Sequence, residues 1–209
     1  MFEPLLKYFG QVADVLAIDL PGCGRSPLIP PDWDQYTSDA LATLIKRVLD
    51  ERCTNRKLIL IGHSLGTILV GRVAMLYGDK CLATVLLCPK AEISEKEAKG
   101  LRFITSLPEF AFNFFRRRDR AYPFFYRSQG VIVIRGGINS MSVRRSVGSH
   151  ASEDVRIQQL VWNIESRTPT TLRFLRGAKP LTREDWGQVV APTLIIVGEE
   201  VSFHQKYVG

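Results

Sequence analysis

The chain has 209 residues, a formal net charge of +7 and 45% hydrophobic residues, which predicts one globular domain or one domain with an insertion. It contains no run of about 20 apolar residues that would predict a membrane-spanning helix. Glu3 interrupts the N-terminal apolar stretch, which is unlike a secretory signal peptide. These features favour a cytoplasmic protein that contacts membranes at most peripherally.

Cysteine and glycine spacing gives no sign of a bound cofactor. Cys23, Cys53, Cys81 and Cys88 show no C-x-x-C spacing, which favours free thiols in a reducing compartment over a disulfide framework or a zinc site. The loop Asp19–Ser26 lacks the third glycine of a dinucleotide fingerprint, and no helix follows it directly. We therefore expect no metal and no cofactor.

Helices and strands are predicted to alternate through the first 90 residues. Apolar spacing predicts a helix over residues 2–9, and Thr37 or Ser38 can cap a second helix that ends near residue 52. Continuous apolar runs predict buried strands. The predicted strands cover residues 12–20, 58–61 and 82–87, and a third helix covers residues 67–77.

The alternation stops after residue 90. Helical spacing covers residues 93–107, 109–118 and 154–166, a polar Gly/Ser stretch covers residues 136–149, and a last strand is predicted over residues 189–197. This order predicts an α/β fold: a mostly parallel sheet with helices on both faces and a helical lid inserted between its last two strands. The predicted parts are residues 1–90, the lid at 91–184 and residues 185–209.

The pentapeptide Gly62–Gly66 lies between a predicted strand and a predicted helix. It matches the G-x-S-x-G pattern of a nucleophile elbow, in which a strained turn presents Ser64 to a substrate. Glycines on either side of the serine are expected because side chains there would collide with the turn. His63 faces away from the reaction side and is expected to be packed or hydrogen-bonded. The alternative is an ordinary turn with an exposed serine.

The order of these segments resembles the α/β-hydrolase fold. Four stretches carry the resemblance, which would be the fourth to seventh strands of that fold with their loops: residues 15–26, 59–66, 82–87 and 191–198. The resemblance is to the branch of lidded esterases, lipases and epoxide hydrolases. Because epoxide and haloalkane hydrolases of the family use an aspartate at the elbow, Ser64 implies acyl transfer. The resemblance also implies that the backbone N–H of Leu65 is an oxyanion donor.

The resemblance gives only weak candidates for the catalytic acid. The family's acid lies three residues after the glycine that ends the seventh strand, here Gly198, and that position holds Val201 in this chain. Glu199 and Glu200 are the nearest carboxylates, and we take Glu200 as the candidate. Some members place the acid after the sixth strand, where Glu92 is the second candidate.

The other parts of a complete family site are not found. The family's oxyanion loop would fall before Met1 and its histidine beyond Gly209, so the resemblance implies a chain truncated at both ends. His204 lies too close to the seventh strand, and His150 lies in the predicted lid. Without its early strands the sheet is expected to expose an edge and to self-associate.

Two functions remain open. The first is a serine hydrolase that acts on a small-molecule or lipid-like ester. The second is a non-catalytic binding or scaffold protein on the same fold, or an incomplete gene product. Basic residues stand beside aromatic ones at Phe114–Tyr126, which allows a solvated helix face, an anionic membrane surface or nucleic acid. The solvated helix face is the default interpretation, peripheral membrane contact is the alternative, and no nucleic acid is expected.

Overall fold

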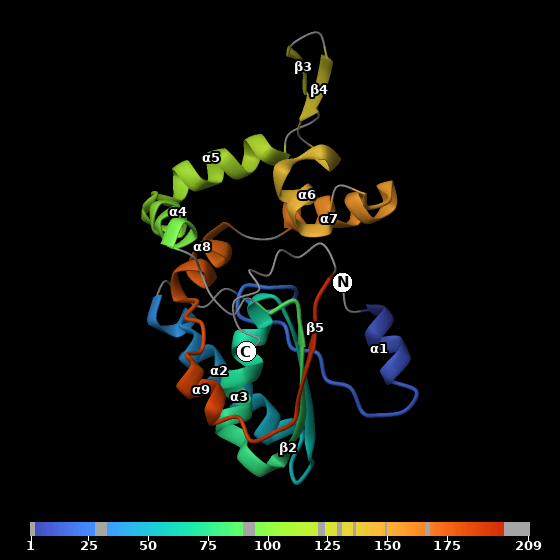
Figure 1. The fold of residues 1–209 in the computed structure, drawn as a ribbon, viewed down its shortest axis with the longest axis vertical. Coiled ribbons are helices and arrows are strands. Elements are labelled where there is room, and N and C mark those ends of the chain that lie inside the picture. The colour runs from blue at the N-terminus through green and yellow to red at the C-terminus, as the bar shows by residue number, and fades with distance from the viewer. Residues whose placement is uncertain are drawn as a thin grey trace, which may run out of the picture.

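The structure is a computed structural model that describes residues 3–27, 33–89, 95–120, 124–128, 131–135, 137–148, 150–165 and 168–198 (Figure 1). It has two tiers. A sheet with α2, α3 and α9 forms one tier, and α4 to α7 form the other, with α8 between them (Figure 1).

The sheet has three parallel strands in the order β1-β2-β5. These are β1 (Leu58–His63), β2 (Cys81–Leu87) and β5 (Thr193–Ile196). In the register of the sheet, Ile61 lies opposite Val85, which lies opposite Leu194. Parallel neighbours need a crossover connection, and α3 (Leu65–Tyr77) provides it between β1 and β2. The predicted α/β fold with a parallel sheet is confirmed.

The strand predicted over residues 12–20 does not form. Residues 14–20 have no regular secondary structure, and Val15 and Leu16 are 44% and 45% exposed. The apolar run predicted burial, but a strand also needs a neighbouring backbone to bond, and this segment joins neither sheet. An exposed ion pair between Asp14 and Arg56 ties its beginning to the turn before β1.

The glycine-rich loop after this segment closes on its own carboxylate. The Asp19 carboxylate accepts the backbone N–H of Arg25 at 3.1 Å, and the Ser26 hydroxyl donates to the Asp19 carbonyl at 2.7 Å. Gly24 has φ +48°, and a Cβ there would overlap the Asp19 carboxylate. The space that a phosphate would need is filled by this side chain.

Two helices cover one face of the sheet. Thr37 caps α2 (Ser38–Arg52), because its Oγ1 accepts the N–H of Ala40 at 3.2 Å. The buried cluster between the helices and β1 consists of Ala42, Leu49 and Val73, with Ile45, Leu58 and Leu60 packed against it. Tyr77 near the end of α3 donates its hydroxyl to Asp50 of α2 at 2.7 Å.

The opposite face of the sheet is apolar and open to solvent. Ile59 and Ile61 of β1 and Leu194 and Ile196 of β5 are 40–59% exposed. The helix α1 (Glu3–Phe9), predicted at this position in the chain, lies on this side of the sheet in Figure 1, but none of its residues is buried. Helices therefore lie on both sides of the sheet, while the described core is built on one.

A pair of threonine hydroxyls links the middle strand to β5. Thr84 of β2 is fully buried, and its Oγ1 lies 2.8 Å from the Oγ1 of Thr193. The two residues face each other in the register of the sheet. The buried Thr84 hydroxyl thus has a partner, while the exposed Thr193 hydroxyl also donates to the Ala191 carbonyl at 3.2 Å.

The chain between β2 and β5 is mainly helical. Its helices are α4 (Glu95–Ser106), α5 (Glu109–Arg120), α6 (Met141–Val147), α7 (Glu153–Glu165), α8 (Thr168–Gly177) and α9 (Arg183–Gly187). The helices predicted over residues 93–107, 109–118 and 154–166 are confirmed as α4, α5 and α7. Within the part of the chain that the structure describes, no helix is long and apolar enough to span a membrane.

Two predictions for this region are wrong. The polar stretch 136–149 contains the helix α6, because the Ser140 hydroxyl caps it by accepting the N–H of Val143 at 3.3 Å. The strands β3 (Phe124–Ser128) and β4 (Val131–Arg135) form an antiparallel hairpin that was not predicted. Figure 1 shows this hairpin projecting beyond the helices.

The two tiers meet where α8 ends against the start of α2. The buried Ser38 hydroxyl donates to the carbonyl of Gly177 at 3.2 Å and accepts the N–H of Lys179 at 3.0 Å. The buried Arg173 guanidinium lies 5.1 Å from the ring centroid of Tyr36. A Cβ at Gly177 would overlap the Tyr36 carbonyl oxygen, so only glycine fits there.

We expect Gly177→Ala to lower the free energy of unfolding by about 2–3 kcal/mol, since α8 would have to move away from Tyr36. Gly187→Ala is the matched control, because a Cβ there meets open space. Chemical denaturation of both variants measures the difference. Equal stability of the two variants would contradict the close approach.

We expect the chain to self-associate through its open sheet face, as the exposed Ile59 and Leu194 leave an apolar surface in water. The double substitution Ile59→Thr and Leu194→Thr places the β-branched side chains that strands favour but makes the face polar. It should reduce association in size-exclusion chromatography with light scattering. A monodisperse monomer of the unsubstituted chain at high concentration would refute this expectation.

Candidate active site

Ser64 stands at the turn between β1 and α3 in a strained conformation. Its backbone angles are φ 51° and ψ −117°, a region that residues with a side chain rarely adopt. Such a conformation costs of order 1–3 kcal/mol and persists only where neighbouring contacts enforce it. The strand-turn-helix context predicted for Gly62–Gly66 is therefore present, with the serine at its apex and exposed to solvent.

Backbone hydrogen bonds hold this conformation on both sides. The Ser64 N–H donates to the carbonyl of Leu87, the last residue of β2, at 3.0 Å. The Ser64 carbonyl accepts two bonds from Thr67, one from its N–H at 3.0 Å and one from its hydroxyl at 2.6 Å. Thr67 is 2% exposed and was not among the predicted site residues. A hydroxyl residue three positions after the serine, in the first turn of a helix, was the signal for it.

The two glycines of the pentapeptide have different roles. A Cβ at Gly62 would lie 2.5 Å from the carbonyl oxygen of Gly66 and 2.7 Å from a methyl group of Val70. A Cβ at Gly66 would meet nothing within 4 Å. The steric argument is thus correct for Gly62 and wrong for Gly66, whose backbone, not its missing side chain, forms the close approach.

The amide of Leu65 is the first of α3. The first amides of a helix have no carbonyl partner within the helix, and the helix dipole favours negative charge near them. A negatively charged oxygen bound beside Ser64 can therefore accept the Leu65 N–H. Both groups lie at the carboxyl end of the parallel sheet, where α/β folds bind their ligands.

The other predicted site residues are not brought to Ser64 by the described structure. Glu92, Glu199, Glu200, Val201 and His204 lie outside the described residues. His63, expected to be packed or hydrogen-bonded, is the last residue of β1 and is exposed, so it is not packed into the core. His150 is exposed in a turn between α6 and α7.

Two hollows of the described structure lie away from the elbow. One of about 300 Å³ is lined by Trp33, Asp34, Thr37, Arg176 and Gly177, and one of about 250 Å³ lies between the Asp19–Ser26 loop and α2. Neither is lined by Ser64. Among the described residues, no group of three His, Cys, Asp or Glu side chains could hold a metal ion.

Sequence comparison finds the same fold pattern in known proteins. A model of the alpha/beta hydrolase family matches residues 1–207. An abhydrolase domain-containing protein of Schizosaccharomyces pombe is 30% identical over 207 residues, which cover 95% of this chain and 53% of the yeast protein. The chain thus spans about half the length of this relative.

Solved structures agree on the fold. A hydrolase from Oleispira antarctica superposes with a TM-score of 0.63 at 14% identity, over 91% of this chain and 64% of that protein. A putative aryl esterase from Burkholderia cenocepacia gives a TM-score of 0.55 at 17% identity, covering 86% of this chain and 59% of its own. Potato epoxide hydrolase I gives a TM-score of 0.52 at 18% identity, covering 87% of this chain and 65% of its own.

The family model covers almost the whole chain, and it agrees with the parallel sheet and with the turn that connects β1 to α3. The chain belongs to the alpha/beta hydrolase family.

Proposed function

We propose that the protein is a serine hydrolase that cleaves an ester or lipid-like acyl substrate, with Ser64 as the nucleophile. The strained backbone of Ser64, at φ 51° and ψ −117°, is the observation that carries this proposal. Strained backbone conformations of this kind cluster at active sites and ligand-binding turns. The hydroxyl is exposed at the sheet end where family ligands bind.

In the proposed reaction the Ser64 Oγ attacks the acyl carbon and its proton passes to a general base. The carbonyl oxygen becomes an oxyanion that the Leu65 N–H stabilises. The alcohol leaves with a proton from the base, and water then attacks the acyl-serine, releasing the acid and restoring Ser64. For the acid that orients the base, Glu200 is our first candidate and Glu92 the second.

The choice of substrate class rests on two features. A serine at the elbow suits acyl transfer, since the family resemblance of the sequence implies an aspartate there for epoxide hydrolases. We also propose that the helices between β2 and β5 form a lid, because they lie beyond the carboxyl ends of the strands (Figure 1). The aromatic side chains of this segment favour an apolar acyl group.

A non-catalytic binding protein on the same fold is the second candidate. One observation favours it: His63 and His150, the histidines among the described residues, are both exposed, and His150 lies in a turn between α6 and α7. A serine hydroxyl without a positioned base is a weak nucleophile at neutral pH.

We expect a fluorophosphonate probe to label the chain at Ser64, and Ser64→Ala to reduce labelling by about 10³-fold or more, because nucleophilic attack needs that oxygen. Mass spectrometry of the labelled peptide identifies the site. Ser106→Ala, at an exposed serine that ends α4, is the matched control and should label normally. If the folded chain takes no label but binds long-chain acyl esters, the binding protein is correct.

Gly62→Ala should lower the free energy of unfolding by about 2–3 kcal/mol and reduce labelling, since its Cβ would push the turn away from the Gly66 carbonyl. Gly66→Ala should change stability by no more than about 1 kcal/mol, because its Cβ is unhindered and alanine favours a helix. Thermal melting of the two variants compares them directly. Equal losses would show that the turn is not as the structure has it.

A further inference from the structure

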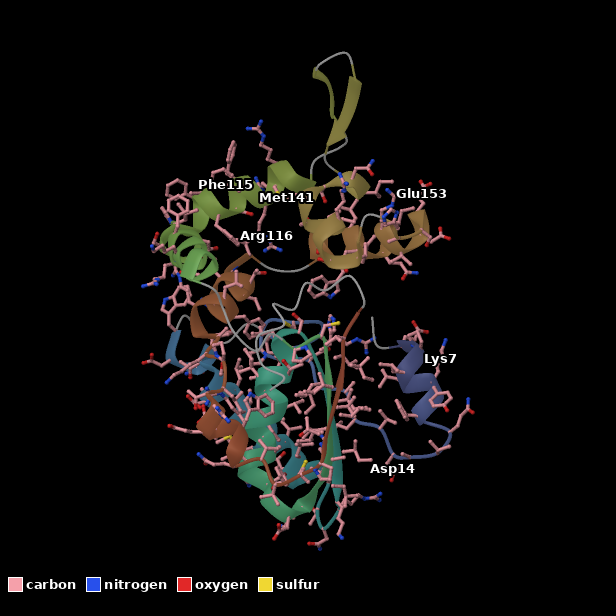
Figure 2. The ribbon with its side chains drawn as sticks, viewed as in Figure 1. Lys7, Asp14, Phe115, Arg116, Met141 and Glu153 are labelled. Carbon is pink, nitrogen blue, oxygen red and sulfur yellow. The ribbon has the colours of Figure 1, made fainter. Side chains whose placement is uncertain are left out.

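Two polar side chains of α5 (Glu109–Arg120), Asn113 and Arg116, lie on the side that faces the rest of the molecule. The Arg116 guanidinium donates to the hydroxyls of Thr168 and Thr171 of α8, both at 3.1 Å. Asn113, one turn earlier, accepts the Thr168 hydroxyl at 3.1 Å. The polar face of α5 is therefore used to attach it to α8, and Figure 2 shows Arg116 pointing from α5 into the molecule.

The opposite side of α5 is aromatic and exposed. Phe110, Phe114 and Phe115 are 77%, 61% and 57% exposed. Residues 110, 114 and 118 follow one another at helical spacing, so Phe110, Phe114 and Arg118 share the outer side, with Arg117 and Phe115 flanking it. We call these five residues the outer face of α5.

Among the described residues, the packing of the helices gives these exposed rings no structural role. Each phenylalanine left in water forgoes the free energy that burial of its ring would supply. The rings of Phe114 and Phe115 contact each other edge to face, with centroids 5.9 Å apart. Contiguous exposed apolar surface of this kind marks a site that another surface covers.

The charged residues near the rings indicate which kind of surface covers the outer face of α5. Arg117 and Arg118 are exposed on the same face as the rings, and Lys99 and Arg102 are exposed on α4, which only Leu107 and Pro108 separate from α5. An anionic surface complements these residues. The rings project from a convex helix, whereas single-stranded nucleic acid needs a groove that follows its backbone. They are phenylalanines, without the polar group that tyrosine or tryptophan brings to a protein interface.

We propose that the outer face of α5 docks the protein on an anionic phospholipid bilayer. The phenylalanines enter the boundary of the acyl chains and the arginines bind lipid phosphates, as in an interfacial amphipathic helix. The helix α5 belongs to the tier beyond the carboxyl ends of the strands, the end at which Ser64 lies (Figure 1). This inference does not depend on the proposed hydrolase activity, since binding to lipid requires no catalysis.

Co-sedimentation with phosphatidylcholine vesicles, with and without phosphatidylserine, tests the proposal. The chain should bind the anionic vesicles much more tightly, and added salt should weaken that binding. Phe110→Ser with Phe114→Ser, and separately Arg117→Gln with Arg118→Gln, should each weaken it about tenfold or more. The apolar control is Ile157→Ser with Val161→Ser, an exposed pair at the same spacing on α7. The charge control is Lys80→Gln with Arg183→Gln, both exposed.

A second measurement does not depend on the polar variants folding. Phe114→Trp should shift its fluorescence to shorter wavelength with anionic vesicles, and Val161→Trp on α7 should not. Equal binding to both vesicle types, equal losses in the control variants, or no fluorescence shift would overturn the proposal. Binding of a single-stranded oligonucleotide that the α5 variants abolish, without vesicle binding, would assign the face to nucleic acid instead.

Discussion

The close approach of Gly62 to the backbone of Gly66 is the contact on which the rest of the sheet tier depends. It allows the chain to leave β1 and enter α3 within one strained residue, so α3 runs back along β1 and β2. Had the turn been wider, α3 could not pack Val73 against Ala42 and Leu49 of α2. Ser64 is strained because this return is tight, and its hydrogen bonds to Leu87 and Thr67 balance the strain.

The sequence predicted the fold where local pattern and tertiary pairing agree. The runs 58–61 and 82–87 became neighbouring strands, because each has the other as a partner. The run 12–20 is as apolar but joins neither sheet, and apolar pattern alone does not reveal whether a partner exists. The hairpin β3-β4 did carry a signal, since Val131–Ile134 is a β-branched run that follows the dipeptide Gln129-Gly130 in the sequence. The residues of its first strand, Phe124–Ser128, were interpreted only as part of a segment of basic and aromatic side chains.

The candidate site was predictable to the extent that it is local in sequence. Ser64 and Leu65 are adjacent, and their roles follow from a turn and a helix start. A catalytic acid or base comes from another part of the chain, so only spatial proximity to Ser64 can identify it. Thr67 shows the intermediate case: its spacing from Ser64 was visible, but its hydrogen bond to the Ser64 carbonyl needed the geometry.

The Thr84–Thr193 pair constrains how this family member can change over evolutionary time. Thr84 is fully buried and its hydroxyl lies 2.8 Å from that of the exposed Thr193, so replacing Thr193 with valine removes this partner of a buried hydroxyl. Replacing both together removes the need for the bond. The two positions are 109 residues apart in sequence, yet they should change in step among relatives. Joint conservation or joint loss of the two threonines among relatives would reflect the register between β2 and β5.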